Sequence, residues 1–211
     1  MNAIESLFVT KLREDDSHWA MTLPIYVSGF LADIEHLFGP RDHSFTMVGI
    51  EIDTTSGASP HLWYPDSGIA PDDTDRRSRH VVIRLTSNAL TDPERARWQL
   101  AHECVHLLDP WNEKVDGRPA NWLEEGLATW FQNTRVPEAE SHEGQYSVAE
   151  NLVSPLMDEL LKSIKLIRRD RRLRISAITP DVLREYCPEF SDETLLKICQ
   201  PFPVTNGEAT Q

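Results

Sequence analysis

The stretches HECVH at residues 102–106 and NWLEEGLA at residues 121–128 decide which fold this chain is expected to adopt. Positions i and i+4 of an α-helix lie one above the other on one face, so His102 and His106 can direct imidazole nitrogens at a single metal ion. Glu103 lies about 100° further around the same helix, where its carboxylate can reach a metal-bound water without binding the metal. The first stretch therefore predicts two metal ligands and a general base on one helix.

The second stretch supplies a carboxylate after 18 intervening residues. Asn121 is a predicted N-cap, and Glu124 follows it at the spacing of a capping box, which assigns Glu124 to the cap and leaves Glu125 as the third ligand. Thr129, one turn after Glu125, is predicted to hydrogen-bond a ligand from outside the metal's coordination sphere. Two histidines and one glutamate leave a fourth tetrahedral position for water, as in catalytic zinc sites. We therefore expect one Zn²⁺ ion.

Together the two stretches resemble the gluzincin metallopeptidases, and within them the aminopeptidase N family most closely. That family places its third ligand in a Trp-Leu-x-Glu-Gly-x-Ala phrase, which reads WLEEGLA here, and the matched region covers about residues 98–131. Carried over by position, the resemblance implies His102, His106 and Glu125 as zinc ligands and Glu103 as the base. The Gly-x-Met-Glu-Asn segment that anchors a free amino terminus in that family has no equivalent before residue 102.

The same family stabilises the oxyanion with a tyrosine well after the third ligand. Tyr186 lies 61 residues beyond Glu125, a comparable interval, and Tyr146 is the nearer candidate. The alternative for each tyrosine is a packed helical residue, because aromatic residues at helical spacing usually pack. His142 is a third candidate for this role, and the alternative is that it is an exposed loop residue.

The flanking segments predict an α+β chain. Apolar residues at helical spacing predict a helix over 24–38 that stops at Gly39-Pro40, and β-branched runs predict strands over 44–52 and 79–86. The segment 60–65 is either a short strand or a loop. Its residues His61, Trp63 and Tyr64 either line the path of an extended substrate or plug the edge of the sheet.

The HECVH helix is expected to begin after Thr91 or Asp92 and to end at 108–110. Further on, we expect a long helix over about 146–168 and two short helices capped by Thr179 and Ser191. The resemblance implies a zincin-like fold, similar to thermolysin or to the minigluzincins, with a small sheet, an active-site helix, a glutamate helix and a helical C-terminal part. The predicted boundaries are a catalytic subdomain at 1–136, a helical subdomain at 137–204 and a disordered tail at 205–211.

Composition narrows the class of protein. The 211 residues carry a net charge of −13, which argues against nucleic-acid binding. Their 40% hydrophobic content suits one globular domain or a domain with a small helical appendage. Three cysteines form neither a CxxC pair nor an even set, which favours a reduced, cytoplasmic setting, and Cys104 is assigned to packing. The N-terminal residues predict no signal peptide, and the apolar run at 21–38 is interrupted by charges, so no membrane span is expected.

The predicted function is hydrolysis of peptide bonds in a peptide or protein substrate by zinc-activated water, with Glu103 as general base. Two alternatives stay open. One is a regulatory or partner-binding protein whose zinc site is catalytically silent. The other is a zinc hydrolase that uses the same residues on a non-peptide amide or ester.

Overall fold

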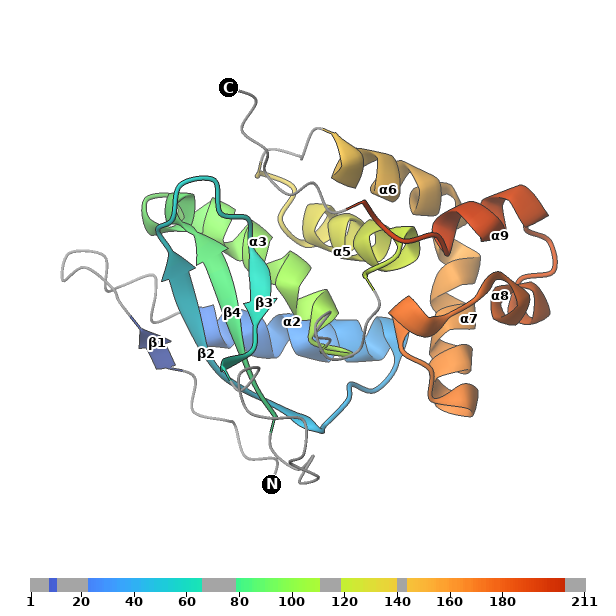
Figure 1. The fold of residues 1–211 in the computed structure, drawn as a ribbon, viewed down its shortest axis with the longest axis horizontal. Coiled ribbons are helices and arrows are strands. Elements are labelled where there is room, and N and C mark those ends of the chain that lie inside the picture. The colour runs from blue at the N-terminus through green and yellow to red at the C-terminus, as the bar shows by residue number, and fades with distance from the viewer. Residues whose placement is uncertain (1–7, 11–22, 66–78, 111–118, 140–143, 204–211) are drawn as a thin grey trace.

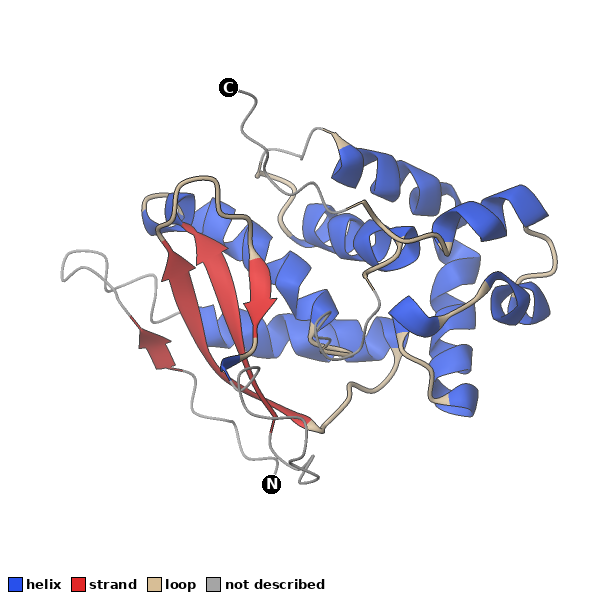
Figure 2. Ribbon diagram, viewed as in Figure 1, coloured by secondary structure: helices blue, strands red, loops and turns tan. Residues whose placement is uncertain are grey.

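The computed structural model describes residues 8–10, 23–65, 79–110, 119–139 and 144–203 (Figure 1). The predicted α+β class is confirmed, since one small sheet is combined with helices that lie behind it and to one side (Figure 2). The acidic segment 71–75, His142 and the predicted tail at 205–211 lie outside the described residues. In the part of the chain that the structure describes, no helix combines the length and the apolar character needed to cross a membrane.

The sheet has four strands in the order β1-β2-β4-β3, formed by Phe8–Thr10, Phe45–Asp53, Arg79–Thr86 and His61–Trp63 respectively. Strands β1, β2 and β4 are parallel, and β3 pairs antiparallel with β4 at one edge. The strands predicted over 44–52 and 79–86 are confirmed to within one residue at each end. Of the two alternatives for residues 60–65, a short strand or a loop, the structure shows a strand of three residues, β3. Strand β1 was not predicted.

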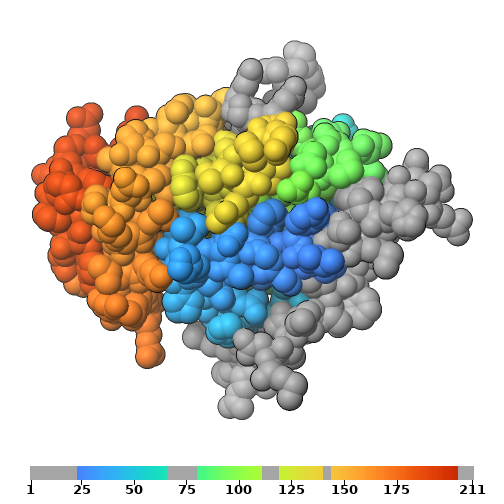
Figure 3. All heavy atoms as spheres, turned by 180° about the vertical axis from the view of Figure 1, so that it is seen from behind, coloured from blue at the N-terminus to red at the C-terminus, as the bar shows by residue number. Residues whose placement is uncertain are grey.

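Helix α2 (Leu23–Phe38) packs against helix α3 (Pro93–His106) behind the sheet (Figure 1). Its buried residues recur at helical spacing and form one apolar stripe: Leu23, Val27, Phe30, Ile34 and Phe38. The helix ends as predicted, because Gly39 adopts a positive φ of 98° and donates its amide to the carbonyl of Glu35 at 3.0 Å. Seen from behind, α2 lies alongside α5 and α7 in one continuous surface (Figure 3).

Helix α3 (Pro93–His106) is tied to the sheet at its first turns. Asp92 is the N-cap, and its carboxylate accepts from the amide of Arg95 at 3.0 Å. The side chain of Gln99 bonds both the amide and the hydroxyl of Thr86, the last residue of β4, at 2.9 and 2.6 Å. The 3₁₀ turn η3 (Ser87–Leu90) joins the strand to the helix. These contacts fix the helix that carries HECVH relative to the sheet.

Helices α5 (Trp122–Arg135) and α6 (Gln145–Val153) lie unusually close together, because Gly126 has no side chain. A Cβ atom built on Gly126 would lie 2.6 Å from the carbonyl oxygen of Ala149. A polar chain links the same helices to α3: the indole of Trp98 donates to Asn133, and Asn133 donates to Glu150.

The C-terminal part is helical, but the single helix predicted over 146–168 is wrong. The structure has α6, a 3₁₀ turn η4 (Ser154–Leu156) and then α7 (Met157–Arg171). Pro155 explains the break, because proline lacks an amide hydrogen and its ring clashes with the preceding helical turn. After η5 (Ile175–Ala177), helices α8 (Pro180–Tyr186) and α9 (Asp192–Ile198) begin at the predicted caps Thr179 and Ser191.

One hydrophobic core contains residues of the sheet and of helices that come before and after residue 136, the predicted end of the catalytic subdomain. A buried ion pair between Asp109 and Arg168 reinforces this connection. Arg168 also donates to the carbonyl of Pro40 at 2.6 Å, and Asp109 accepts from the amide of Ile175 at 3.2 Å. The residues just after α3 are thereby held to α7 and to the end of α2.

Candidate metal centre

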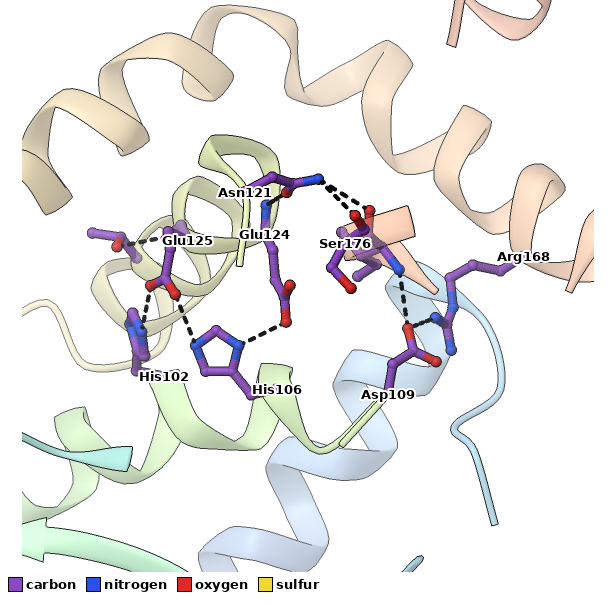
Figure 4. Close-up of polar contacts among 10 residues, drawn as sticks. His102, His106, Asp109, Asn121, Glu124, Glu125, Arg168 and Ser176 are labelled. Atoms are coloured by element: carbon purple, nitrogen blue, oxygen red, sulfur yellow. Dashed lines mark hydrogen bonds and ion pairs between the residues drawn. The ribbon is translucent and has the colours of Figure 1, made fainter. Parts of the chain in front are cut away.

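Three side chains from two helices converge at one point (Figure 4). His102 and His106 project from α3, and Glu125 projects from the first turn of α5. His102 Nε2 lies 3.2 Å from Glu125 Oε2, and His106 Nε2 lies 3.7 Å from Glu125 Oε1. One candidate ligand atom from each residue lies within 4.8 Å of those of the other two, so the group could hold a metal ion.

The hydrogen bonding of Glu125 fits a cation better than a closed protein network. Its Oε2 atom is buried and has no hydrogen-bond partner among the described residues, although His102 Nε2 lies 3.2 Å away. A buried carboxylate oxygen without a partner is costly, and a divalent cation between the carboxylate and the imidazoles would satisfy it. Two imidazole nitrogens and one carboxylate are a donor set that suits zinc. The residues present therefore fit the expected ion.

Glu124 does not have the role assigned to it from sequence. The Asn121 cap is present, because its side chain accepts from the amide of Glu124 at 2.8 Å. The carboxylate of Glu124, however, is directed at His106, with Oε1 2.9 Å from Nδ1 (Figure 4). The capping-box rule considers only the local helix, whereas here an imidazole from α3 lies within reach. Glu124 is thus the outer partner of a candidate metal ligand.

Thr129 also differs from its prediction. Its hydroxyl donates to the backbone carbonyl of Glu125 at 2.8 Å, one turn earlier in the same helix. A threonine inside a helix commonly forms this bond to the carbonyl at i−4. Thr129 therefore supports the backbone of the candidate ligand rather than its carboxylate.

Glu103 lies beside the group and is only 3% exposed. Burial raises the pKa of its carboxyl group, and the imidazoles of His106 and His102 offset only part of that increase. A carboxylate with a raised pKa close to three candidate ligands is suited to accept and return a proton. Its neighbour Cys104 is fully buried in the hydrophobic core, as predicted.

The candidate ligands shift one another's ionisation in the absence of metal. Burial alone would lower the pKa of His106, but the carboxylates of Glu125 and Glu124 outweigh burial and raise it to about 10. Burial would raise the pKa of Glu125, but His106 and His102 outweigh it and hold that pKa below its usual value. Without a metal, His106 is therefore favoured in its protonated, positively charged form, which is paired with the carboxylates of Glu125 and Glu124.

The two candidate tyrosines lie in different places. Tyr146, in the first turn of α6, stands edge-on to His102 with ring centroids 5.6 Å apart. Burial, and then the charges of Glu125 and Glu103, raise the pKa of Tyr146 well above its usual range. Tyr186 ends α8, where its ring lies 5.8 Å from the guanidinium of Arg171. The structure thus brings Tyr146 to the group and places Tyr186 with α7.

The three residues predicted at the edge of the sheet, His61, Trp63 and Tyr64, also lie in different surroundings. The ring of Trp63 lies under the guanidinium of Arg84 at 4.1 Å, and Tyr64 packs edge-on against Phe45. His61 is close enough for its charge to lower the pKa of Glu103, and its Nδ1 atom lies 2.9 Å from the carbonyl oxygen of Ser59. Of the three, His61 is the one whose charge reaches the candidate site.

Sequence reasoning missed two residues of this site. Glu124 could have been found, because metal-binding histidines usually donate their second ring nitrogen to a carboxylate or carbonyl. Phe202 carried no such signal: it follows α9 in sequence, yet its ring lies 5.2 Å from that of Tyr146. In comparisons with known proteins, no family model, no curated protein and no solved structure matches this chain.

Proposed function

We propose that this protein is a zinc-dependent metallopeptidase of the gluzincin type, with a zincin-like arrangement of sheet and helices. The observation that supports the proposal most strongly is the convergence of His102, His106 and Glu125, with the buried carboxylate of Glu103 beside them. Three protein ligands leave an open position for substrate or water, which is typical of catalytic sites.

The chemistry that a zinc ion supplies in such a site is Lewis-acid activation, which lowers the pKa of water toward about 7 and polarises a carbonyl group. Glu103 accepts the proton of the attacking water on its carboxylate and then delivers it to the nitrogen of the departing amine. Its raised pKa makes the first transfer easier, because a carboxylate whose conjugate acid has a higher pKa is a stronger base.

Tyr146 is the better placed of the two tyrosines to stabilise the oxyanion. Its hydroxyl is protonated at neutral pH, since its pKa is raised further above the already high usual value for tyrosine, so the phenol is available as a hydrogen-bond donor. Its ring lies against that of the candidate ligand His102, with the centroids 5.6 Å apart. We therefore assign this role to Tyr146 and not to Tyr186.

The proposed substrate is a peptide or protein, and the proposed compartment is the cytoplasm. All three cysteines are unpaired, which suits a reducing environment.

The decisive experiment measures zinc per chain and peptide cleavage for the wild type and for Glu103→Gln. Glu103→Gln should keep its zinc and lose about 10²-fold or more of the activity, the usual scale for general acid–base catalysis. A chelator should abolish wild-type cleavage, and zinc should restore it. Glu94→Gln is the matched control, because Glu94 lies on the same helix but pairs with Arg97 on the surface.

The alternatives predict other results. Stoichiometric zinc without cleavage of any peptide or protein in a broad library would favour a partner-binding protein with a silent site. Cleavage confined to esters or non-peptide amides, and lost in Glu103→Gln, would favour a different zinc hydrolase. Full activity in Glu103→Gln would refute the mechanism.

A further inference from the structure

Residues 200–203, called here the C-terminal clamp, return from α9 to the start of the glutamate helix α5 (Figure 1). The amide of Trp122 donates to the carbonyl of Gln200 at 3.1 Å, and the amide of Phe202 donates to the carbonyl of Ala120 at 2.7 Å. These two bonds flank a bridge between Asn121 and Pro201. The clamp is therefore fixed by backbone bonds directly before the helix turn that carries Glu125.

This register places the side chain of Phe202 between two aromatic residues of the site. Phe202 lies 4.9 Å from the ring of Trp122 and 5.2 Å from the ring of Tyr146, and it is only 6% exposed. Tyr146 in turn stands against His102. A continuous row of rings thus connects the clamp to a candidate metal ligand.

The position of Phe202 distinguishes it from an ordinary core residue. Although it is buried, it does not belong to the main hydrophobic core of the described residues. Its ring contacts are with Trp122 and Tyr146 instead. Tyr146 is the second residue of α6, so the clamp contacts this helix at its start.

We propose that Phe202 is a positioning residue that holds Tyr146 against His102, so that the C-terminal clamp controls the geometry of the oxyanion donor. This inference rests on the proposed peptidase function for its catalytic consequence, but not for the contact itself. A donor must be placed within a fraction of an ångström to act, and a displacement of about 1 Å can cost about 10²-fold in rate.

The kinetic test compares Phe202→Leu, Tyr146→Phe and the double variant. Leucine keeps an apolar side chain in the clamp and removes the aromatic contact. We expect Phe202→Leu to lower kcat by about tenfold or more, with KM and zinc content unchanged. Tyr146→Phe should lower kcat by about 10²-fold, and the double variant should match Tyr146→Phe because both changes act through one hydroxyl. Additive losses, or a loss confined to KM, would overturn the proposal.

Phe190→Leu is the matched control, since Phe190 lies in the turn that connects α8 to α9 and is a partly buried residue packed against the hydrophobic core. It should leave kcat and KM unchanged. A comparable fall in kcat in this variant would mean that any loosening of the C-terminal helices impairs activity, and would count against a specific role for Phe202.

The structural test uses hydrogen–deuterium exchange on the metal-free wild type and Phe202→Leu. Amides at 145–149 should exchange faster in the variant, while those at 98–105 in α3 should not change. Equal exchange at 145–149, or faster exchange throughout, would overturn the proposal. If the wild type cleaves no peptide, the proposed function fails, whereas this measurement still decides whether the clamp holds the start of α6.

Discussion

The carboxylate of Glu124 sets the orientation and tautomer of His106. With Oε1 2.9 Å from Nδ1, the ring donates its Nδ1 hydrogen to Glu124 and leaves Nε2 unprotonated for a metal when the imidazole is neutral. The amide of Glu124 is itself held by Asn121, whose side-chain nitrogen lies 3.4 Å from the carbonyl oxygens of Ile175 and Ser176. A candidate ligand is therefore positioned by residues from three segments of the chain.

Two substitutions of Glu124 should weaken metal binding to different degrees. Glu124→Ala removes both the acceptor and its charge and should lower the zinc affinity about 10–100-fold. Glu124→Gln keeps an acceptor oxygen and should fall between alanine and the wild type. Competition with a chromogenic chelator measures each affinity, with Glu94→Ala as the control. Equal zinc affinities for wild type and Glu124→Ala would contradict this role.

The raised pKa of His106 predicts a pH-dependent stability of the metal-free protein. In the folded chain this pKa is about 10, whereas a free histidine has a pKa of about 6.5. The protonated form is thus favoured by folding, and its contribution is fully present below about pH 6.5 and is lost as the pH rises toward about 10. Thermal unfolding of chelator-treated protein between these values should show a falling midpoint.

His106→Asn is the comparison for this measurement. It removes the titrating group, so its midpoint should depend less on pH over the same range. Identical pH profiles for this variant and the wild type would show that other groups dominate the stability of the metal-free protein.

At the scale of elements, the contact between α5 and α6 depends on a missing side chain. Gly126 follows the candidate ligand Glu125, and a Cβ atom there would lie 2.6 Å from the carbonyl of Ala149 and 2.8 Å from a methyl group of Val153. The first obstacle is backbone and cannot move without displacing α6. The glycine in the WLEEGLA phrase therefore sets the distance between the helix of Glu125 and the helix of Tyr146.

Gly126→Ala and Gly29→Ala should change stability in opposite directions. Gly126→Ala should cost about 1–3 kcal/mol, the usual range for overpacking. Gly29 lies in α2 with no atom within 4 Å of a built Cβ, so alanine there should stabilise by about 0.5–1 kcal/mol through helix propensity. Chemical denaturation measures both, and a destabilised Gly29→Ala or a neutral Gly126→Ala would contradict this comparison.

At the scale of the whole molecule, the described helices and the sheet share one core. Buried residues from α2, β2, β4 and α3 belong to the same cluster as those from α7, α8 and α9. The Asp109–Arg168 pair crosses the predicted subdomain boundary at 136/137. These connections favour a single cooperative unit, although the prediction of two subdomains remains to be tested by unfolding.

The positions of the tryptophan residues allow the unfolding of the two predicted subdomains to be followed by different signals. All six tryptophans precede residue 136, while α6 to α9 contribute much of the helical signal. We expect urea unfolding followed by tryptophan fluorescence and by far-UV circular dichroism to give coincident transitions, as a two-state domain requires. A separate loss of helical signal before or after the fluorescence change would instead support an independent C-terminal subdomain.

Local rules of sequence were sufficient for most of the elements and for part of the site. Spacing of four residues places His102 and His106 on one helical face, and caps at Asp92, Asn121 and Ser191 begin helices where expected. Such features depend on residues within one or two turns of each other, so they can be derived without knowing the fold. The break at Pro155 is equally local, because a proline inside a helical pattern ends or kinks the helix.

Only the tertiary structure places Tyr146, and not Tyr186, against His102, because both tyrosines lie on predicted helices and the packing of those helices determines which ring reaches this residue. It also redirected Glu124 from its own helix to His106 and brought Phe202 to Tyr146. Each of these contacts joins separate helices or loops, and their relative placement follows from burial of a shared core rather than from any local pattern. The sequence by itself therefore determined the candidate ligand residues, while tertiary packing selected the residues that surround them.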